Sequence, residues 1–416
     1  MNDGKEVVSR RAVLKTGAGG ALATVLTRDA ASMEPTPQTE ALRVYAALGI
    51  QPIINAAGTI TTLGGSLMPP EVLAAWQDAS QNFVSLLELQ DKVGERIAGL
   101  LGVEAALVTT GAAGGIVVGT AAAVTLHDSS LVNRLPLPPE MGLEVIRQKA
   151  HRACYDNQVE SCGVRLVDVE TRAELEAAIN RRTVMMFSYN VHEADGKIPQ
   201  ADWVEVARQN EIPTLLDAAA DTPPLDALRK YNRLGFDMVV FSGGKALRGP
   251  QDAGLLLGRK DLIGSAKRNT APYCGNIGRG MKVSKEDMVA MWAAVKRFVN
   301  LDHEAERRQW EQRIETIATS LNDIPTIRTE QIVPPIANQI PHLLIFWDQQ
   351  RVKISYAEMK QQLVQGKPSI ATARVHGTGQ DGFLISVFML KSGEDTIVAA
   401  RLREILKTAS VLAATK

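Results

Sequence analysis

The sequence predicts an α/β protein with a mostly parallel central sheet and a smaller C-terminal α+β domain. Short apolar segments rich in Val and Leu alternate with helical stretches such as 171–179 and 202–210. Continuous apolar strands separated by helices are typical of a parallel sheet covered on both faces. Six segments have this strand pattern, at 105–110, 164–169, 183–190, 214–218, 237–242 and 254–258.

The remaining elements follow in chain order. Helices are expected at 69–85, where Pro70 suits the first turn, and at 89–101. A long charged amphipathic helix is predicted from Ser284 to Leu321, leading into the C-terminal domain. That domain should hold strands and helices at 342–348, 382–388, 356–365 and the C-terminus. The expected domains are an N-terminal signal at 1–32, an arm at 33–66, a large domain at 67–290, and a linking helix with a small domain at 291–416.

The composition describes a globular chain and excludes several classes of protein. The 416 residues are enough for two domains, and Lys+Arg and Asp+Glu both number 46. No net field therefore draws the chain to nucleic acid or to an anionic membrane. The three cysteines (Cys154, Cys162 and Cys274) have no metal-type spacing, and the six histidines are scattered. We expect no metal site, no disulfide framework and no membrane span.

The N-terminus has the pattern of a twin-arginine export signal. Arg10 and Arg11 precede a mildly apolar run at 16–26 and a small-residue patch at 30–32. The pattern predicts export to the periplasm or beyond, with the twin-arginine machinery as a partner. The alternative is a tail in which the arginine pair occurs by chance, in which case the protein is cytoplasmic.

Two predicted strands end in residues that together suggest a cofactor. The run at 213–221 (PTLLDAAAD) reaches Asp217, and the run at 237–254 breaks into two glycines and Lys245. A carboxylate and a lysine at neighbouring strand ends suit pyridoxal 5'-phosphate (PLP). The acid keeps the pyridine nitrogen protonated and the lysine forms a Schiff base. The alternative is that both are solvated residues at strand ends.

A loop of small residues could hold the phosphate of that cofactor. Thr110, Gly111, Ala112 and Ala113 follow a predicted strand and open a helix. Backbone N–H groups at a helix N-terminus bind anions, and small side chains allow a close approach. Ser242 could add a hydroxyl. Small residues at such a turn also serve tight packing, so the loop alone is not specific.

Three further side chains are candidates with ordinary alternatives. His151 follows a helix-like segment and could stack on a cofactor or handle protons, but the residues alone favour a structural histidine. Arg374 is a candidate clamp for a substrate carboxylate, because guanidinium binds carboxylate through two donors. His192 is either at the cleft or in a polar turn.

Several motifs resemble one family of enzymes. The segments at 54–59 (INAAGT), 88–115 and 213–221, and FSGGKALRGPQDAGLLLGRKDLI at 241–263, look like fold type I (aspartate aminotransferase-like) PLP enzymes. Within that fold they resemble the bacterial selenocysteine synthase-like group, and more closely its D-glucosaminate-6-phosphate ammonia-lyase-type paralogues. The resemblance covers about residues 41–390. It departs at the N-terminus, where selenocysteine synthase has an RNA-binding domain.

The resemblance implies roles for the candidate residues. Lys245 would carry the cofactor, Asp217 would meet its pyridine nitrogen and His151 would stack on its ring. Ser242 and the loop at 110–113 would lie near the phosphate. Such enzymes are homodimers or higher oligomers with active sites at subunit interfaces, so Gln251 is expected near the neighbouring subunit's cofactor.

The function predicted from these observations is a PLP-dependent lyase acting on an amino acid or amino sugar acid. Arg374 would hold the substrate carboxylate, Lys245 would remove the Cα proton, and a group on Cβ would leave. Four alternatives use the same fold: a selenium transferase acting on L-seryl-tRNA, an aldolase or racemase, an aminotransferase, and an exported protein without turnover. The balanced charge argues against the tRNA substrate.

Overall fold

The computed structural model describes residues 44–373 and 382–414. The chain divides into two units, 1–52 and 53–416. In the first unit a helical turn at 44–47 closes with a hydrogen bond from the Ile50 N–H to the Tyr45 carbonyl, 2.9 Å long. The predicted signal at 1–32 and the candidate clamp Arg374 lie outside the described residues. All elements below belong to the second unit.

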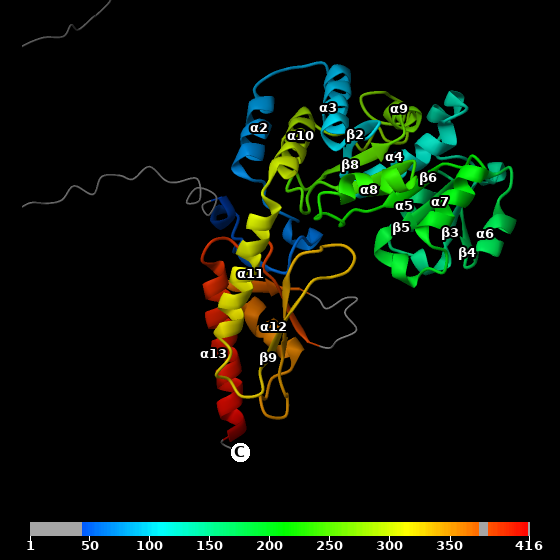
Figure 1. Ribbon diagram of the computed structural model, residues 1–416. Coiled ribbons are helices and arrows are strands. Elements are labelled where there is room, and N and C mark those ends of the chain that lie inside the picture. Colours follow the sequence, from blue (N-terminus) through cyan, green and yellow to red (C-terminus); the bar gives the residue numbers. More distant parts are fainter. Residues whose placement is uncertain (1–43, 374–381, 415–416) are drawn as a thin grey trace, which may run out of the picture. The chain divides into compact units, whose positions relative to one another are not determined.

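A seven-stranded sheet forms the centre of this unit, in the order β2-β8-β7-β6-β5-β3-β4. Strand β8 is antiparallel to both its neighbours, β2 and β7, and every other pair is parallel. The predicted α/β class with a mostly parallel sheet is therefore confirmed (Figure 1). The strands are β2 Ala105–Thr110, β3 Glu144–Gln148, β4 Arg165–Val169, β5 Thr183–Tyr189, β6 Thr214–Asp217, β7 Met238–Ser242 and β8 Ala253–Gly258.

Strand β3 was not predicted, because the segment before His151 was interpreted as helix-like. All five residues of β3 are nevertheless buried. The segment contains Glu144 and Arg147, whose residue types are mostly exposed in folded proteins. In the fold both charges have partners from β4, since Glu144 pairs with Arg165, and Arg147 Nη2 lies 2.7 Å from Asp168 Oδ1. These partners are twenty-one residues away in sequence, so no local pattern reveals them.

Helices cover both faces of the sheet, as the apolar strands require. Alternate strand residues point to opposite sides: Leu215 and Val240 pack with α4, α5 and α9, whereas Leu216 and Val239 pack with α3, α7, α8 and α10. These two apolar layers form the core. The helices are α2 Pro70–Ser80, α3 Leu86–Leu101, α4 Gly111–Thr125, α5 Asp156–Glu160, α6 Arg172–Ala178, α7 Gln200–Gln209, α8 Ala227–Leu234 and α9 Lys260–Arg268.

The long helix predicted from Ser284 to Leu321 is two helices, so that prediction was wrong. Helix α10 spans Lys285–Asn300 and α11 spans His303–Thr319. Leu301 has an extended backbone, with ψ 141°, and Asp302 caps α11 by accepting a hydrogen bond from the Ala305 N–H at 2.9 Å. Aspartate is one of the preferred N-cap residues, so a new helix begins after Asp302 although the amphipathic pattern continues through this position.

The C-terminal part is α+β, as predicted. Strand β10 (His342–Phe346) lies between β9 (Arg328–Ile332) and β12 (Phe383–Ser386) in an antiparallel sheet. A pairing absent from the predictions joins β1 (Ile53–Ala56) in parallel to β11 (Ser369–Thr372). Two helices complete this part, α12 Tyr356–Gln365 and α13 Glu394–Ala414. No helix within the described residues is both long and apolar enough to cross a membrane.

Candidate active site

Six of the seven strands, all except β8, have their carboxyl ends at one edge of the sheet. Strands β7, β6, β5 and β3 are parallel, and β2 shares their direction because β8 runs antiparallel to both β2 and β7. Ligands of open α/β sheets bind at this edge. Strand β4, parallel to β3, ends there at Val169, and the other five strands end at Thr110, Gln148, Tyr189, Asp217 and Ser242.

Asp217 is buried and Lys245 is half-buried at this edge. Asp217 ends β6 with 9% of its surface exposed, and its Oδ1 accepts a hydrogen bond from the Ala219 N–H at 2.8 Å. Burial raises the pKa of Asp217 to about 6, against the opposing effects of that hydrogen bond and of the Lys245 charge. Burial likewise lowers the pKa of Lys245, while Asp217 and Asp221 raise it. Because β6 and β7 pair in parallel, the acid that ends β6 and the lysine in the turn after β7 lie at neighbouring strand ends.

The turn that carries Lys245 depends on two glycines. A Cβ on Gly243 would lie 2.7 Å from the Ala253 carbonyl oxygen, and one on Gly244 would lie 2.5 Å from Gln251 Cα. Real Cβ atoms do not approach backbone so closely, so the turn is possible only without these side chains. The N–H of Ser242 donates to the Ala219 carbonyl at 3.2 Å and ties this turn to the one after Asp217.

His151 lies completely buried in the 3₁₀ turn η4 (Lys149–His151), which directly follows β3. Its Nδ1 accepts a hydrogen bond from the Tyr189 N–H at 3.3 Å, and its Nε2 has no partner among the described residues. Burial, followed by the charge of His192, lowers the pKa of His151 to about 4. The ring is therefore neutral and keeps one buried donor for a bound group.

The N-terminus of α4 is open, as a phosphate cradle requires. Thr110 stands at the N-cap, yet no side-chain hydrogen bond caps this end. Gly111 has φ 63°, a conformation that favours glycine, and a Cβ on Gly114 would lie 2.3 Å from Thr110 Oγ1. The first-turn N–H groups of Gly111, Ala112 and Ala113 are thus free of side-chain caps at the positive end of a fifteen-residue helix.

This set of groups fits PLP. A buried acid suits the pyridine nitrogen, a half-buried lysine suits the aldehyde, and an uncapped helix N-terminus suits the phosphate. The unpartnered Nε2 of His151 supplies a further buried donor. In the described part of the chain, no group of three or more His, Cys, Asp or Glu side chains is placed to hold a metal ion.

The other sequence candidates have different outcomes. Gln251 is exposed, and its Nε2 donates to the Thr61 carbonyl of the same chain at 3.2 Å, so its approach to a neighbouring subunit stays a prediction. The His192 ring centroid lies 6.4 Å from that of His151, and its Nδ1 lies 3.1 Å from Asp195 Oδ2.

Sequence reasoning missed a buried polar network beside the site. Asp221 Oδ2 accepts hydrogen bonds from Asn190 Nδ2 and from the Tyr231 hydroxyl, both at 2.6 Å. Gln200 Nε2 donates to Asn190 Oδ1, also at 2.6 Å. A cavity of about 330 Å³ adjoins these four side chains. The only local signal was that Asp221 is the acid that closes the 213–221 run, and this position does not identify its partners.

Comparison with known sequences identifies the family of the chain. The family model for L-seryl-tRNA selenium transferase (SelA) matches residues 53–307. D-glucosaminate-6-phosphate ammonia lyase of Salmonella typhimurium is 30% identical over 378 residues, which cover 88% of this chain and 99% of the relative. A 5'-C-glycyluridine monooxygenase-decarboxylase of a Streptomyces species is 30% identical over 339 residues, covering 78% and 83% of the two chains.

Solved structures give the same result. A structure of D-glucosaminate-6-phosphate ammonia-lyase superposes with a TM-score of 0.77 at 29% identity, covering 88% of this chain and 99% of that one. A structure described as SPT with PLP has a TM-score of 0.53 at 15% identity, covering 87% and 88%, and shows the fold alone. The sequence matches, the superposition and the residues at the sheet edge agree, and the chain belongs to the L-seryl-tRNA selenium transferase family of PLP-dependent enzymes.

Proposed function

We propose that the protein is a PLP-dependent lyase of the ammonia-lyase type. Its substrate would be an amino acid or amino sugar acid that loses the Cα proton and a Cβ hydroxyl. Loss of water followed by hydrolysis gives a 2-oxo acid and ammonia. The observation that carries the proposal is the placement of Asp217 and Lys245 at neighbouring strand ends on the carboxyl edge of the sheet. The likeness to an ammonia lyase over 88% of the chain supports the reaction class.

When bound, PLP lowers the energy of negative charge on the substrate Cα by spreading it into a protonated pyridine ring. Lys245 would hold the cofactor aldehyde and then accept the Cα proton. Because burial lowers its pKa, more of its amine is uncharged near neutral pH than in an exposed lysine. An uncharged amine is the form that acts as nucleophile and base.

The other residues bind and orient. Asp217 would keep a proton on the pyridine nitrogen, because a positive partner offsets the cost of burying its carboxylate. His151 presents a neutral ring and an unshared N–H, which suits stacking and hydrogen bonding better than proton removal. The first turn of α4, with Ser242 nearby on β7, would bind the phosphate. Arg374 remains the proposed clamp for the substrate carboxylate.

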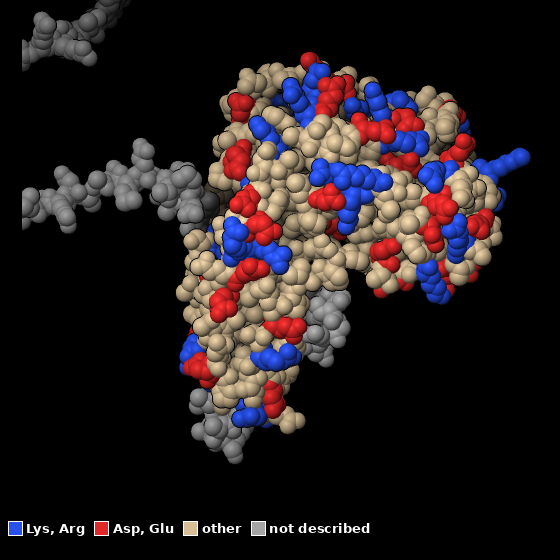
Figure 2. All heavy atoms as spheres, in the orientation of Figure 1, with Lys and Arg blue, Asp and Glu red and all other residues tan. Residues whose placement is uncertain are grey.

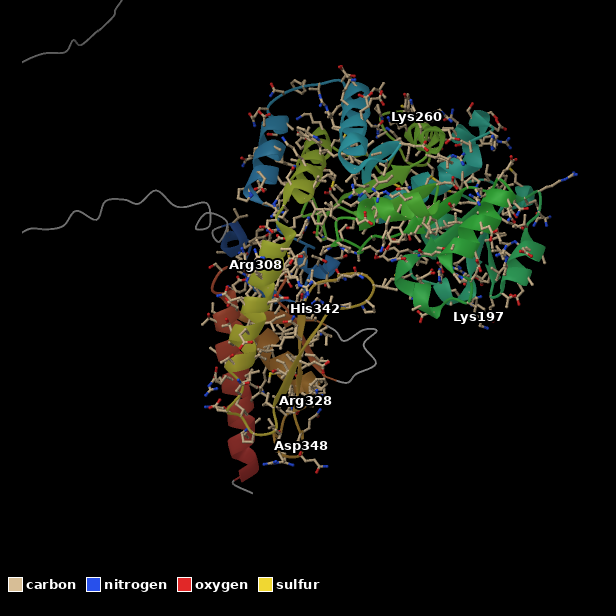
Figure 3. All side chains as sticks on the ribbon, in the orientation of Figure 1. Lys197, Lys260, Arg308, Arg328, His342 and Asp348 are labelled. Carbon is tan, nitrogen blue, oxygen red and sulfur yellow. The ribbon has the colours of Figure 1, made fainter. Side chains whose placement is uncertain are left out.

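The experiment compares Lys245→Ala with Lys260→Ala, a change at an exposed lysine on α9 that is labelled in Figure 3. We expect Lys245→Ala to lose the visible absorption of the lysine-bound cofactor and to lose ammonia release from a panel of D- and L-amino acids and amino sugar acids. Lys260→Ala should keep both. Retention of both properties by Lys245→Ala would refute the proposed function.

A second candidate is transfer chemistry of the selenium transferase type, because the family model bears that description. It would share the first proton removal but add a nucleophile to Cβ in place of hydrolysis. On the face drawn in Figure 2, Lys and Arg are interspersed with Asp and Glu and form no continuous basic surface. That observation and the balanced charge favour a small substrate. Binding of seryl-tRNA by the purified protein would reverse the preference.

We also propose that the protein is a homodimer or higher oligomer. Large apolar side chains of α2, α3 and the loop between them are exposed, among them Trp76, Val84 and Leu87, and Phe83 is fully exposed. Contiguous exposed apolar side chains mark association surfaces. Light scattering should give a mass above 45.0 kDa, and Phe83→Ser should reduce it. A wild-type monomer would contradict this proposal.

Export is proposed from the sequence of 1–32. Replacing Arg10 and Arg11 with lysine should leave the protein in the cytoplasm, because the twin-arginine route reads the arginine pair. An unchanged periplasmic yield would argue against the signal.

A further inference from the structure

A second cavity lies beside the lysine turn and is bordered by α11 and the residues that follow β12. Its volume is about 220 Å³. Trp310 and Phe388 pack edge to face in its wall, with ring centroids 5.3 Å apart. The lining residues are Leu67, Arg248, Glu306, Gln309, Trp310, Arg313, Phe388, Met389, Leu390 and Lys391.

The charged groups in this lining are unbalanced. Arg248, Arg313 and Lys391 face one carboxylate, that of Glu306. Within residues 44–373 and 382–414, no carboxylate oxygen lies within 4.0 Å of a side-chain nitrogen of these three residues, although Glu394 Oε2 accepts a hydrogen bond from the Lys391 backbone N–H at 2.8 Å. Glu306 instead has Arg297 as its partner, with Oε1 3.6 Å from Nη2. The lining therefore has a surplus of positive charge that the described side chains do not neutralise.

The two arginines are held in place through the backbone and keep donors to spare. Arg248 Nε donates to the Leu67 carbonyl at 2.8 Å, and Arg313 Nη1 donates to the Val387 carbonyl at 3.2 Å. A guanidinium has five N–H donors in a fixed fork, so each keeps several. Burial first, and then the charge of Arg297, lowers the pKa of Arg248; Glu306 and Glu71 oppose this shift, and Arg313 adds to it. Like charges held together in a partly buried cavity favour the binding of an anion.

We propose that this cavity binds an oxyanion, a carboxylate or phosphate group, between Arg248, Arg313 and Lys391. Arginine binds both groups through paired donors, and the fixed guanidiniums lose little freedom on binding. Arg248 lies three residues after Lys245 and has φ 56°, a left-handed conformation that costs free energy in a residue other than glycine. An anion bound to Arg248 would therefore stabilise the turn that carries the lysine.

The test measures inorganic phosphate binding to the PLP-loaded protein by calorimetry, so that the cofactor already fills its own phosphate site. We expect Arg313→Gln to weaken phosphate binding by roughly tenfold or more, the factor for one lost charge-assisted hydrogen bond. Lys391→Gln is a second variant at an exposed position, in case the loss of the contact to Val387 disturbs folding. Arg308→Gln, on the same helix α11 and labelled in Figure 3, is the matched control and should bind like the wild type.

The proposal is overturned if the wild type binds no phosphate, or if Arg313→Gln and Lys391→Gln both bind it as tightly as Arg308→Gln. Steady-state kinetics with added phosphate would show whether the natural anion is part of the substrate. Competitive inhibition by phosphate would assign the cavity to an acidic group of the substrate, and an unchanged KM would assign it to a separate ion. Because phosphate binding is measured without turnover, the anion site and the proposed lyase activity can fail independently.

Discussion

The backbone N–H of Tyr189 donates a hydrogen bond to Nδ1 of His151 over 3.3 Å, and this contact determines where the imidazole carries its proton. A nitrogen that accepts a hydrogen bond has no hydrogen of its own, so the neutral ring holds its proton on Nε2. Because burial lowers the pKa of His151 to about 4, this neutral form persists through the physiological range. The ends of β3 and β5 thus present a fixed hydrogen-bond donor at the sheet edge.

The first prediction concerns cofactor affinity at His151. Changing His151 to Ala should weaken PLP binding by about tenfold, since a buried donor and an aromatic face are both lost. His151→Phe should recover part of that loss because it restores the face but not the donor. Titrating the cofactor-free protein with PLP by fluorescence measures both. His127→Ala, at an exposed histidine, is the control. If His151→Ala binds as tightly as this control, the ring does not contact the cofactor.

The second prediction is that Asp217 destabilises the protein when no cofactor is bound. Burial raises its folded-state pKa to about 6 from 3.8, so between pH 4 and 6 the folded chain binds more protons than the unfolded chain. The free energy of unfolding therefore falls as pH rises through this window, by up to about 3 kcal/mol. Asp217→Asn cannot lose a proton and should be more stable than the wild type at pH 7.5.

Urea unfolding of the cofactor-free proteins at pH 4.5 and pH 7.5 checks this prediction. The advantage of Asp217→Asn should be larger at the higher pH, where the wild-type carboxylate is charged. The same variant should lose turnover by about a hundredfold or more, because its amide does not hold a proton on the pyridine nitrogen. An Asp217→Asn protein less stable than the wild type at pH 7.5 would show that the carboxylate has a stabilising partner.

The acid and the lysine of the site could be predicted because their signals are local. Asp217 and the turn of Lys245 each follow an apolar run. The alternation of such runs with helices predicts a parallel sheet, in which the carboxyl ends of neighbouring strands lie at the same edge. Asp221 could not be assigned in this way. Its role depends on Asn190 and Tyr231, which lie thirty-one residues before it and ten residues after it in sequence. No sequence window contains that network.

The two errors in the predicted fold also arise because local sequence patterns do not reveal distant partners or single capping residues. Strand β3 contains charged residues whose partners come from β4, so it does not look buried until the sheet is formed. The break between α10 and α11 depends on one residue, Asp302, inside an amphipathic pattern that runs through it. A period of apolar residues predicts which face is buried, but a single N-cap decides where the helix begins.

The third prediction tests the support of the phosphate cradle. A Cβ added to Gly254 on β8 would lie 2.4 Å from the carbonyl carbon of Gly111, the first residue of α4. Backbone cannot move away as a flexible side chain can, so Gly254→Ala should displace the first turn of α4. We expect it to lower the free energy of unfolding by about 1–3 kcal/mol and to weaken PLP binding.

Gly264→Ala is the matched control for that change. Gly264 lies within α9, and a Cβ there meets no atom within 4 Å. Alanine at this position should stabilise the protein by up to about 1 kcal/mol, because alanine has the higher helix propensity. Equal stability and equal PLP affinity of the Gly254→Ala and Gly264→Ala proteins would contradict the close approach of β8 to α4.

The last prediction concerns the network that the sequence did not reveal. Tyr231→Phe removes one of the two donors to the buried Asp221 carboxylate and should lower the free energy of unfolding by about 1–3 kcal/mol. Tyr273→Phe, at an exposed tyrosine, should change it by less than about 0.5 kcal/mol. In an Asp221→Asn background, Tyr231→Phe should lower the free energy of unfolding by less, because the phenol hydroxyl stabilises a neutral amide less than it stabilises a buried carboxylate. Equal costs in the two backgrounds would mean that the hydroxyl stabilises the fold independently of the Asp221 charge, for example through the hydrogen bond that it accepts from Asn190 Nδ2 at 2.8 Å.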